Sequence, residues 1–184
     1  VGKGLSGATI VIKPSTHLIS PESNAILGNT CLYGATSGKL FAAGQAGERF
    51  AVRNSGAITV VEGCGANGCE YMTGGTAVFL GPVGDNFGAG MTGGMAYVLD
   101  PHDRFKHLVN RETLQVQRLA APHWEESLRN LIGEHARETD SAFAHSLLRD
   151  WDRVRGQFWQ VVPKEMLSRL PHPLAEESAM FERA

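Results

Sequence analysis

Apolar and polar residues alternate in short stretches that recur along the first hundred residues of the chain. The steps between the clearest copies are 18, 18 and 19 residues, and these copies begin at Ser37, Ser55, Thr73 and Thr92. A stretch that begins at Ser6 resembles an earlier copy. Each stretch contains β-branched or aromatic side chains and is bounded by glycines, which predicts short β-strands separated by turns.

The constant step predicts how the strands are arranged. A period of 18–19 residues is too short for pairs of helices and suits a β-solenoid, in which each coil stacks on the last. Glycine suits the stacked turns because it reaches a positive φ without steric cost. We predict an all-β, right-handed parallel β-helix of about five or more coils, followed by an α-helical C-terminal tail. Its structural turn glycines are Gly28, Gly47, Gly65, Gly84, Gly38, Gly56, Gly74 and Gly93.

Positions that alternate along the predicted strands form mostly apolar columns. Two columns are expected to share a side of the coil: Ile10, Phe41, Thr59, Ala77 and Ala96, and Ile12, Ala43, Val61, Phe79 and Val98. The intervening column is apolar as well and contains Val11, Ala42, Val60, Val78 and Tyr97. Since one set must point outward, we expect the outer face to pack on something, such as other domains.

The composition changes near Pro101 and suggests three segments. Twenty of the 22 glycines come before it, whereas residues 101–184 hold 12 basic and 13 acidic side chains. We predict a glycine-rich β-helix at 1–100, a connecting segment at 101–121, and a helical tail or cap at 122–184 that ends in an extended segment.

Within that tail, helices are expected at 123–138 and 140–155, with Pro122 at the first helical position. Thr139 or Asp140 is expected to cap the second helix. The tail either caps the last coil or docks a partner through Phe158 and Trp159, which look exposed in the sequence.

Charge and cysteine content narrow the class of protein. The formal net charge is −2, which argues against the usual basic surface that binds nucleic acid. No apolar run approaches the roughly 20 residues of a membrane span, so we expect no membrane partner. Three cysteines without a disulfide-like spacing favour a reducing, cytoplasmic setting. Because the chain begins at Val1 without a signal-peptide pattern, we expect it to be a piece of something larger.

Several motifs resemble functional sites without the context that such sites need. The stretches Gly63–Gly68 and Gly88–Gly93 match G-x-G-x-x-G, but each leads into a predicted strand, whereas a dinucleotide site opens a helix. The stretch Gly34–Lys39 resembles a phosphate loop but is one residue short, and Leu40 stands where a Mg²⁺-binding Ser or Thr would be needed.

The remaining candidates for chemistry are cysteines, histidines and carboxylates. Cys31, Cys64 and Cys69 are expected to be buried and inert. The tail histidines are expected on solvated helix faces: His102, His107, His123, His135 and His145. A carboxylate pair for glycan cleavage is conceivable, but solvation or turn hydrogen bonding is the safer interpretation for Glu62, Glu70, Asp85 and Asp100. We expect no catalytic, cofactor-binding or metal-binding residue in this segment.

Long stretches of the sequence resemble one known family. The segments Asn54–Gly63, Gly68–Gly75 and Asn86–Asp100, together with Phe158–Lys164 in the tail, are similar to the C-terminal, glycine-repeat (GXGXG) domain of the glutamate synthase large subunit. The resemblance covers essentially the whole chain. The family commonly has Val, Asp and His where this chain has Cys64, Ala66 and Asn67. A subunit of formylmethanofuran dehydrogenase shares the repeat.

The resemblance implies a structural role inside a larger enzyme. Such an enzyme converts glutamine and 2-oxoglutarate to two glutamates. It uses a glutaminase domain and a barrel that holds FMN and an iron–sulfur cluster, and those sites lie outside this segment. The implied partners are these domains of the same subunit, with the small NADPH-oxidising subunit or other protomers as further possibilities. The alternatives are a free-standing β-helix enzyme that acts on polysaccharide and a binding module that recruits a partner through its tail.

Overall fold

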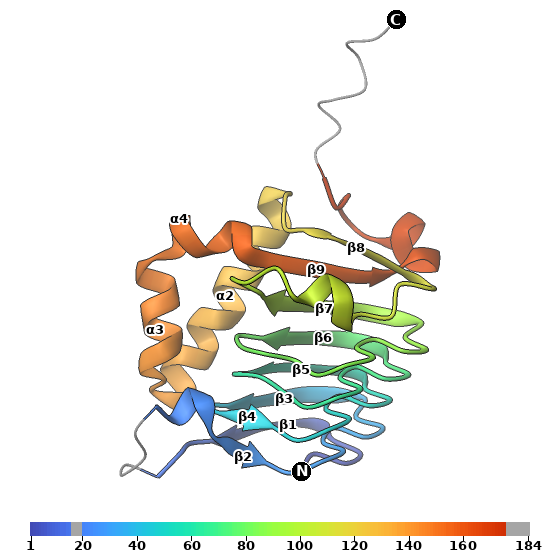
Figure 1. The fold of residues 1–184 in the computed structure, drawn as a ribbon. Helices are drawn as coiled ribbons and strands as arrows, with labels where there is room; N and C mark the ends of the chain where they lie inside the picture. Colours follow the sequence, from blue (N-terminus) through green and yellow to red (C-terminus); the bar gives the residue numbers. More distant parts are fainter. Residues whose placement is uncertain (16–19, 176–184) are drawn as a thin grey trace, which may run out of the picture.

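Five parallel strands, one from each copy of the repeat, form the main sheet of the computed structural model (Figure 1). The model describes residues 1–15 and 20–175. The strands are β1 (Ser6–Ile12), β3 (Ser37–Ala42), β5 (Ser55–Val61), β6 (Thr73–Phe79) and β7 (Gly93–Leu99). Each pairs in parallel with the next, so four turns of a solenoid connect them. The predicted parallel β-solenoid is confirmed, with slightly fewer coils than the five or more expected.

The register within the second coil differs from the predicted columns. Thr59 pairs with Leu40, and Val60 pairs with Phe41. Phe41 therefore lies in the intervening column with Val60, and Ala42 lies beside Val61 rather than Val60. The predicted columns were therefore shifted by one residue in β3. The register of β1 and of β5 shifts near the start of each strand, whereas the pairing of β3 with β5 has no such shift.

The opposite side of each coil is formed mostly by turns. A small second sheet pairs β2 (Ala25–Leu27) with β4 (Gln45–Ala46) after the 3₁₀ turn η1 (Pro21–Ser23). Beyond it, each coil places three alternate residues at positive φ: Thr30, Leu32 and Gly34; Arg49, Ala51 and Arg53; Asn67, Cys69 and Tyr71; and Asn86, Gly88 and Gly90.

The alternation in these turns links neighbouring coils. In the second turn, the amides of Arg49 and Arg53 donate to the following coil, and the amide of Ala51 donates to the preceding coil. A left-handed conformation costs a non-glycine residue about 1–2 kcal/mol. The left-handed residues are retained here because successive left-handed residues direct their amides alternately to the following and to the preceding coil. Each of these amides thereby reaches a backbone carbonyl.

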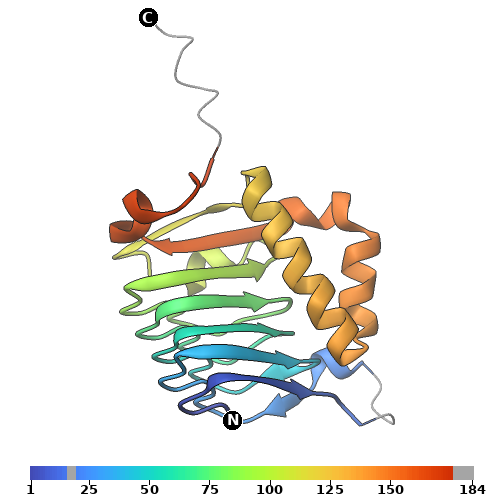
Figure 2. The ribbon, with the colours of Figure 1, turned by 180° about the vertical axis from the view of Figure 1, so that it is seen from behind.

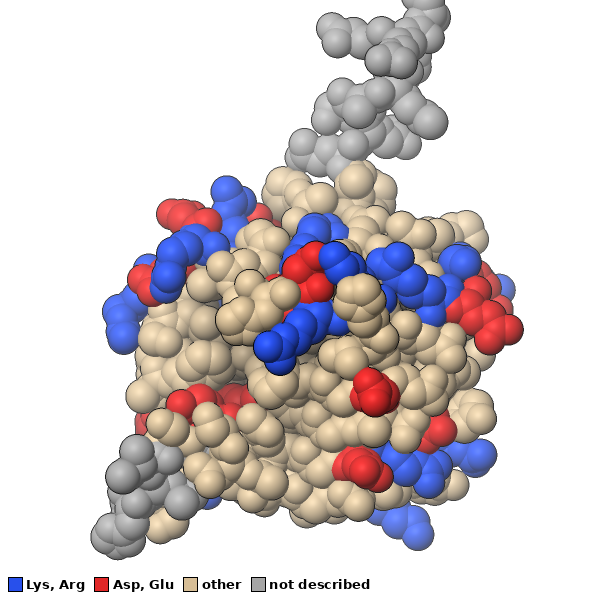
Figure 3. All heavy atoms as spheres, in the orientation of Figure 1, with Lys and Arg blue, Asp and Glu red and all other residues tan. Residues whose placement is uncertain are grey.

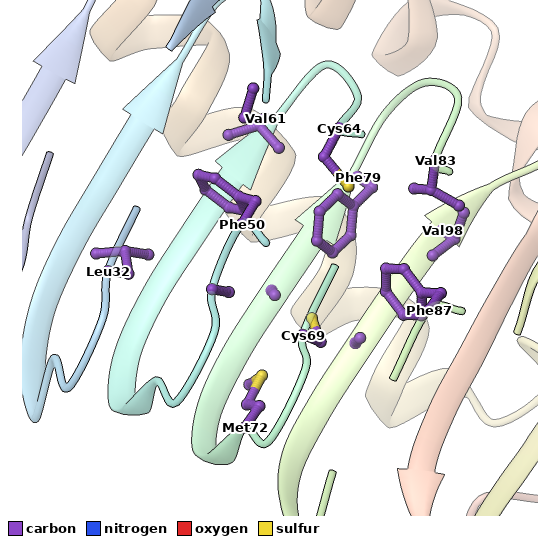
Figure 4. Close-up of a cluster of buried hydrophobic side chains, with 14 of the residues drawn as sticks. Leu32, Phe50, Val61, Cys64, Cys69, Met72, Phe79, Val83, Phe87 and Val98 are labelled. Atoms are coloured by element: carbon purple, nitrogen blue, oxygen red, sulfur yellow. The ribbon is translucent and has the colours of Figure 1, made fainter. Parts of the chain in front are cut away.

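The solenoid interior is a continuous apolar core between the main sheet and the turns (Figure 4). Four neighbouring aromatic rings, Phe50, Phe79, Phe87 and Phe105, meet edge to face with centroids 5.2–5.9 Å apart. Phe105 belongs to the short helix α1 (Phe105–Leu108), so this row of rings extends past the last repeat strand. Edge-to-face contact is the geometry that aromatic quadrupoles favour, and the row of rings links successive coils along the solenoid axis.

The C-terminal part closes the last coil with two antiparallel strands. The strand β9 (Phe158–Pro163) pairs with β7, and β8 (Leu114–Arg118) pairs with β9. Phe158 is fully buried and Trp159 is half-buried. The hypothesis that this pair forms an exposed docking site is therefore wrong, because both residues are part of the strand that covers the edge of β7.

Helices cover the outer face of the main sheet. Figure 2 shows α2 (Pro122–Thr139) crossing the strands diagonally, with α3 (Ala142–Arg149) and α4 (Trp151–Val154) beyond it. The outward column Phe41, Val60, Val78 and Tyr97 packs with Leu128 and Ile132 of α2 in a second apolar core. The outer face thus packs on the chain's own helices, which corrects the expectation that other domains would cover it.

The junction between α2 and α3 differs from the prediction in the residue that caps α3. Pro122 is at the start of α2, as expected. Asp140 takes a left-handed conformation and ends that helix, and the Ser141 side chain, not Thr139 or Asp140, accepts the capping hydrogen bond from the amide of Ala144. Two 3₁₀ segments, η2 (Arg155–Gln157) and η3 (Lys164–Arg169), flank β9.

Candidate functional site

A buried polar cluster joins the solenoid to its helical cover. Glu62 follows β5 directly, His135 lies near the end of α2, and Ser141 caps α3. The Nε2 atom of His135 is 3.2 Å from Oε1 of Glu62, and the Ser141 hydroxyl donates to the same oxygen. All three side chains are buried, and the His135 ring also lies 6.0 Å from the Phe41 ring. The sequence separates Glu62 from His135 by 73 residues.

The connectivity of this cluster does not match a catalytic triad. In a triad the imidazole lies between the carboxylate and the nucleophile, so that it can take the proton of the hydroxyl. Here the carboxylate lies in the centre: it contacts Nε2 of His135 and accepts from the Ser141 hydroxyl, while the Ser141 oxygen also accepts from the amide of Ala144. The arrangement ties three elements together and does not activate a hydroxyl. Glu62 Oε2 and His135 Nδ1 are buried without a hydrogen-bond partner among the described residues.

The structure corrects two expectations about charged residues. His135 was expected on a solvated helix face but is completely buried, whereas His102, His107, His123 and His145 are exposed. Glu62 is likewise buried rather than solvated. The reason is that the outward column of β5 lies against α2, which removes water from both side chains at once. The helical periodicity placed His135 on the apolar face with Leu128 and Ile132, and this was the signal for its burial.

The other three carboxylates differ in their surroundings. Asp100 accepts from the amides of Arg104 and Phe105, at 3.1 and 2.8 Å, which confirms turn hydrogen bonding at that position. Glu70 forms an ion pair with Arg49 at 2.9 Å, and Asp85 is exposed. No two of these four carboxylates are linked to each other by a contact in the described residues.

The cysteines are free and buried, as predicted. Burial raises the pKa of Cys64 to about 12 and raises that of Cys69 as well. Within residues 1–15 and 20–175, no three His, Cys, Asp or Glu side chains are grouped to hold a metal ion.

The glycine motifs lie in the turns between coils. Neither Gly63–Gly68 nor Gly88–Gly93 opens a helix, and the second leads directly into β7. Of the eight predicted turn glycines, four lie inside strands rather than in turns: Gly38, Gly56, Gly74 and Gly93. Gly38 alone of the eight has a positive φ, at 98°. At Gly47, Gly56, Gly74, Gly84 and Gly93, a Cβ atom would approach a neighbouring coil within 2.0–2.4 Å. The stacking distance, rather than the backbone conformation, therefore requires glycine at most of these positions, while Gly28 has open space around it.

The surface seen in Figure 3 carries few charges over the middle of the solenoid, and Lys and Arg gather toward the C-terminal end of the stack. In the part of the chain that the structure describes, no helix is long and apolar enough to cross a membrane.

Comparison with known proteins gives consistent matches over the whole chain. The model of the GXGXG motif family matches residues 1–164. The chain is 64% identical over 175 residues to a glutamate synthase [NADPH] large chain of Azospirillum brasilense, covering 95% of this chain and 12% of the relative. It is 57% identical over 164 residues to a ferredoxin-dependent glutamate synthase of Pyropia yezoensis (89% and 11%), and 48% identical over 178 residues to a glutamate synthase [NADH] of Schizosaccharomyces pombe (96% and 8%). The chain thus spans about an eighth or less of the length of these relatives.

Proposed function

The chain belongs to the GXGXG motif family, and from that premise we propose that it is a structural, non-catalytic domain of a glutamate synthase large chain. The observation that carries the proposal is the 64% identity over nearly the whole chain to a large chain of which it matches only 12%. The activity of the complete enzyme is proposed to reside in its remaining domains, which carry the FMN and the iron–sulfur cluster in the family.

We propose that the domain holds the glutaminase domain and the FMN-dependent synthase domain in register, so that ammonia passes from one to the other. A rigid spacer suits this task because a transfer path between two sites tolerates little misplacement. The stacked turns, the row of aromatic rings and the buried Glu62–His135–Ser141 cluster support such rigidity, since each links elements distant in the sequence. The three side chains of the cluster are buried between the sheet and the helices.

We propose that the residues which determine the electron donor lie outside this domain. Relatives named as NADPH, NADH and ferredoxin-dependent enzymes share the segment at 64, 48 and 57% identity, so one scaffold accompanies all three donors. A small NADPH-oxidising subunit and other protomers are further partners in this proposal. The cytoplasm stays a prediction, since some of the relatives are named as chloroplastic.

The proposal is tested in the full-length large chain with its electron donor, by comparing glutamine hydrolysed with 2-oxoglutarate consumed. Gly74→Ala places a Cβ atom 2.2 Å from the carbonyl oxygen of Ser55 and should disturb the stacking. We expect glutamine hydrolysis to continue while more free ammonia is released. The matched control is Gly133→Ala in α2, where the nearest atom is 3.5 Å from the added Cβ. In this control the ratio of glutamine hydrolysed to 2-oxoglutarate consumed should remain that of the parent enzyme.

Two outcomes would contradict the proposal. If a variant with parent-like circular dichroism and FMN content lost either half-reaction outright, the segment would carry chemistry itself. If the stacking were disturbed, as shown by a lower unfolding temperature, and the ratio of the two consumptions nevertheless stayed unchanged, the domain would not maintain the register.

A further inference from the structure

A large apolar pocket lies between the last coils of the solenoid and the helices α1, α3 and α4. Its volume is about 960 Å³, and it is enclosed by the turn after β6, the end of β7, helix α1, and helices α3 and α4. The floor is built from aliphatic and aromatic side chains, among them Leu80, Leu99, Phe105, Phe143 and Leu147. A pocket of this size that is mostly apolar is typical of sites that accept a ligand or the side chains of a partner.

The mouth of this pocket carries the positive charge of Arg104, which forms no ion pair within the described residues. His102, Arg104 and His107 are exposed there, and their side chains form no hydrogen bond or ion pair with the described residues. Arg153 also lines the mouth and pairs with Asp150 at 2.7 Å.

The single carboxylate of the lining is already occupied. Asp100 accepts from the amides of Phe105 and Arg104 and, at 3.0 Å, from the indole of Trp159. Although burial acts to raise the pKa of Asp100, these hydrogen bonds hold it below the ordinary value. Asp100 therefore stays an internal acceptor, and the unpaired arginine, Arg104, determines the charge of the ligand that the mouth attracts.

We propose that this pocket docks a segment of the same large polypeptide, in which an apolar side chain fills the floor and a neighbouring Asp or Glu meets Arg104. The inference rests on the proposed function. The relative with 64% identity is matched over 12% of its length, so most of such a polypeptide lies outside these residues and is held close by covalent connection. An apolar anchor beside a complementary charge is the usual composition of an interface centre. The site would be one point at which the scaffold holds another domain.

The test places a photoreactive group in the pocket of the complete large chain. Phe143 is replaced by p-benzoylphenylalanine, the purified enzyme is irradiated, and the cross-linked peptide is identified by mass spectrometry. We expect a cross-link within the same polypeptide, to a peptide that carries an apolar residue next to Asp or Glu. Arg104→Glu should lower the yield about tenfold, since facing like charges oppose docking.

The matched control is Arg129→Glu, an exposed arginine on α2 outside this pocket, which should leave the cross-link yield unchanged. A cross-link to a second molecule, to a peptide without a carboxylate, or to nothing would overturn the docking proposal, as would equal yields in the two charge variants. Because the peptide is mapped without measuring turnover, this result is separate from the ammonia measurement. The enzyme could retain coupling with an empty pocket, or lose it with the pocket filled.

Discussion

At the scale of single residues, close approach between coils explains most of the repeating glycines. Gly56 and Gly93 have ordinary backbone conformations, but a Cβ atom at either would lie 2.0 Å from a carbonyl oxygen of the preceding coil. Many left-handed positions are taken by non-glycine residues such as Leu32, Ala51 and Cys69, whose side chains belong to the core. The close approach of neighbouring coils thus excludes a side chain at positions such as Gly56 and Gly93. Backbone strain is instead tolerated at the left-handed, non-glycine positions of the turns.

Gly74→Ala should therefore destabilise the chain, whereas Gly133→Ala should stabilise it. The first change forces a Cβ atom against the Ser55 carbonyl, and overpacking of this kind costs about 1–3 kcal/mol or more. The second removes a glycine from the interior of α2, where alanine is favoured by about 1 kcal/mol. Unfolding free energies of both variants, measured by urea titration, would check that the first change lowers stability and the second raises it. Equal effects of the two changes would show that stacking distance is not the constraint.

At the scale of elements, the helical cover and the solenoid are joined by two different kinds of contact. The first is apolar, between Phe41, Val60 and Tyr97 of the sheet and Leu128 and Ile132 of α2. The second is the buried Glu62–His135–Ser141 cluster. The apolar contact supplies most of the free energy because it removes large side chains from water. The polar cluster specifies where along the sheet α2 and α3 lie, since a buried carboxylate is costly anywhere without its donors.

His135→Ala should lower the unfolding free energy by about 3–5 kcal/mol, because the Glu62 carboxylate would stay buried without its imidazole partner. The double change Glu62→Met with His135→Leu should recover much of that loss, since apolar residues of similar volume often replace a buried polar pair without cost. The measurement is equilibrium urea unfolding of both variants. A double variant that is less stable than His135→Ala alone would contradict this account.

At the scale of the whole molecule, the C-terminal part serves as the cap of the solenoid. The antiparallel strand β9 lies between β7 and β8, so the unpaired edge of the last coil is not left open. Phe158 is buried in the second apolar core, and Trp159 reaches the first, where its ring lies 6.2 Å from Phe105. The tail is thus part of both cores and cannot be separated from the solenoid.

Deletion of residues 156–184 should unfold or strongly destabilise the chain rather than leave an intact solenoid. It removes β9 and with it both pairings of the antiparallel strands. Circular dichroism and the unfolding temperature would measure the effect. A full-length-like β spectrum and unfolding temperature after this deletion would show that the tail is dispensable for folding.

The amino-acid sequence by itself established the repeat, the parallel solenoid and the start of α2. These features follow from local signals, namely glycines at a constant phase, β-branched residues between them, and Pro122 at a helix start. The burial of the cysteines also followed from their residue type and surroundings.

Other features depended on contacts between residues far apart in the chain. The sequence carries no local signal that Glu62 meets His135, that β9 pairs with β7, or that a helix covers the outward column. The one-residue error at Leu40 and Phe41 has the same origin, because register is set by the neighbouring strand. Local pattern determines which elements form, whereas the free energy of burying their faces together determines which side chains meet.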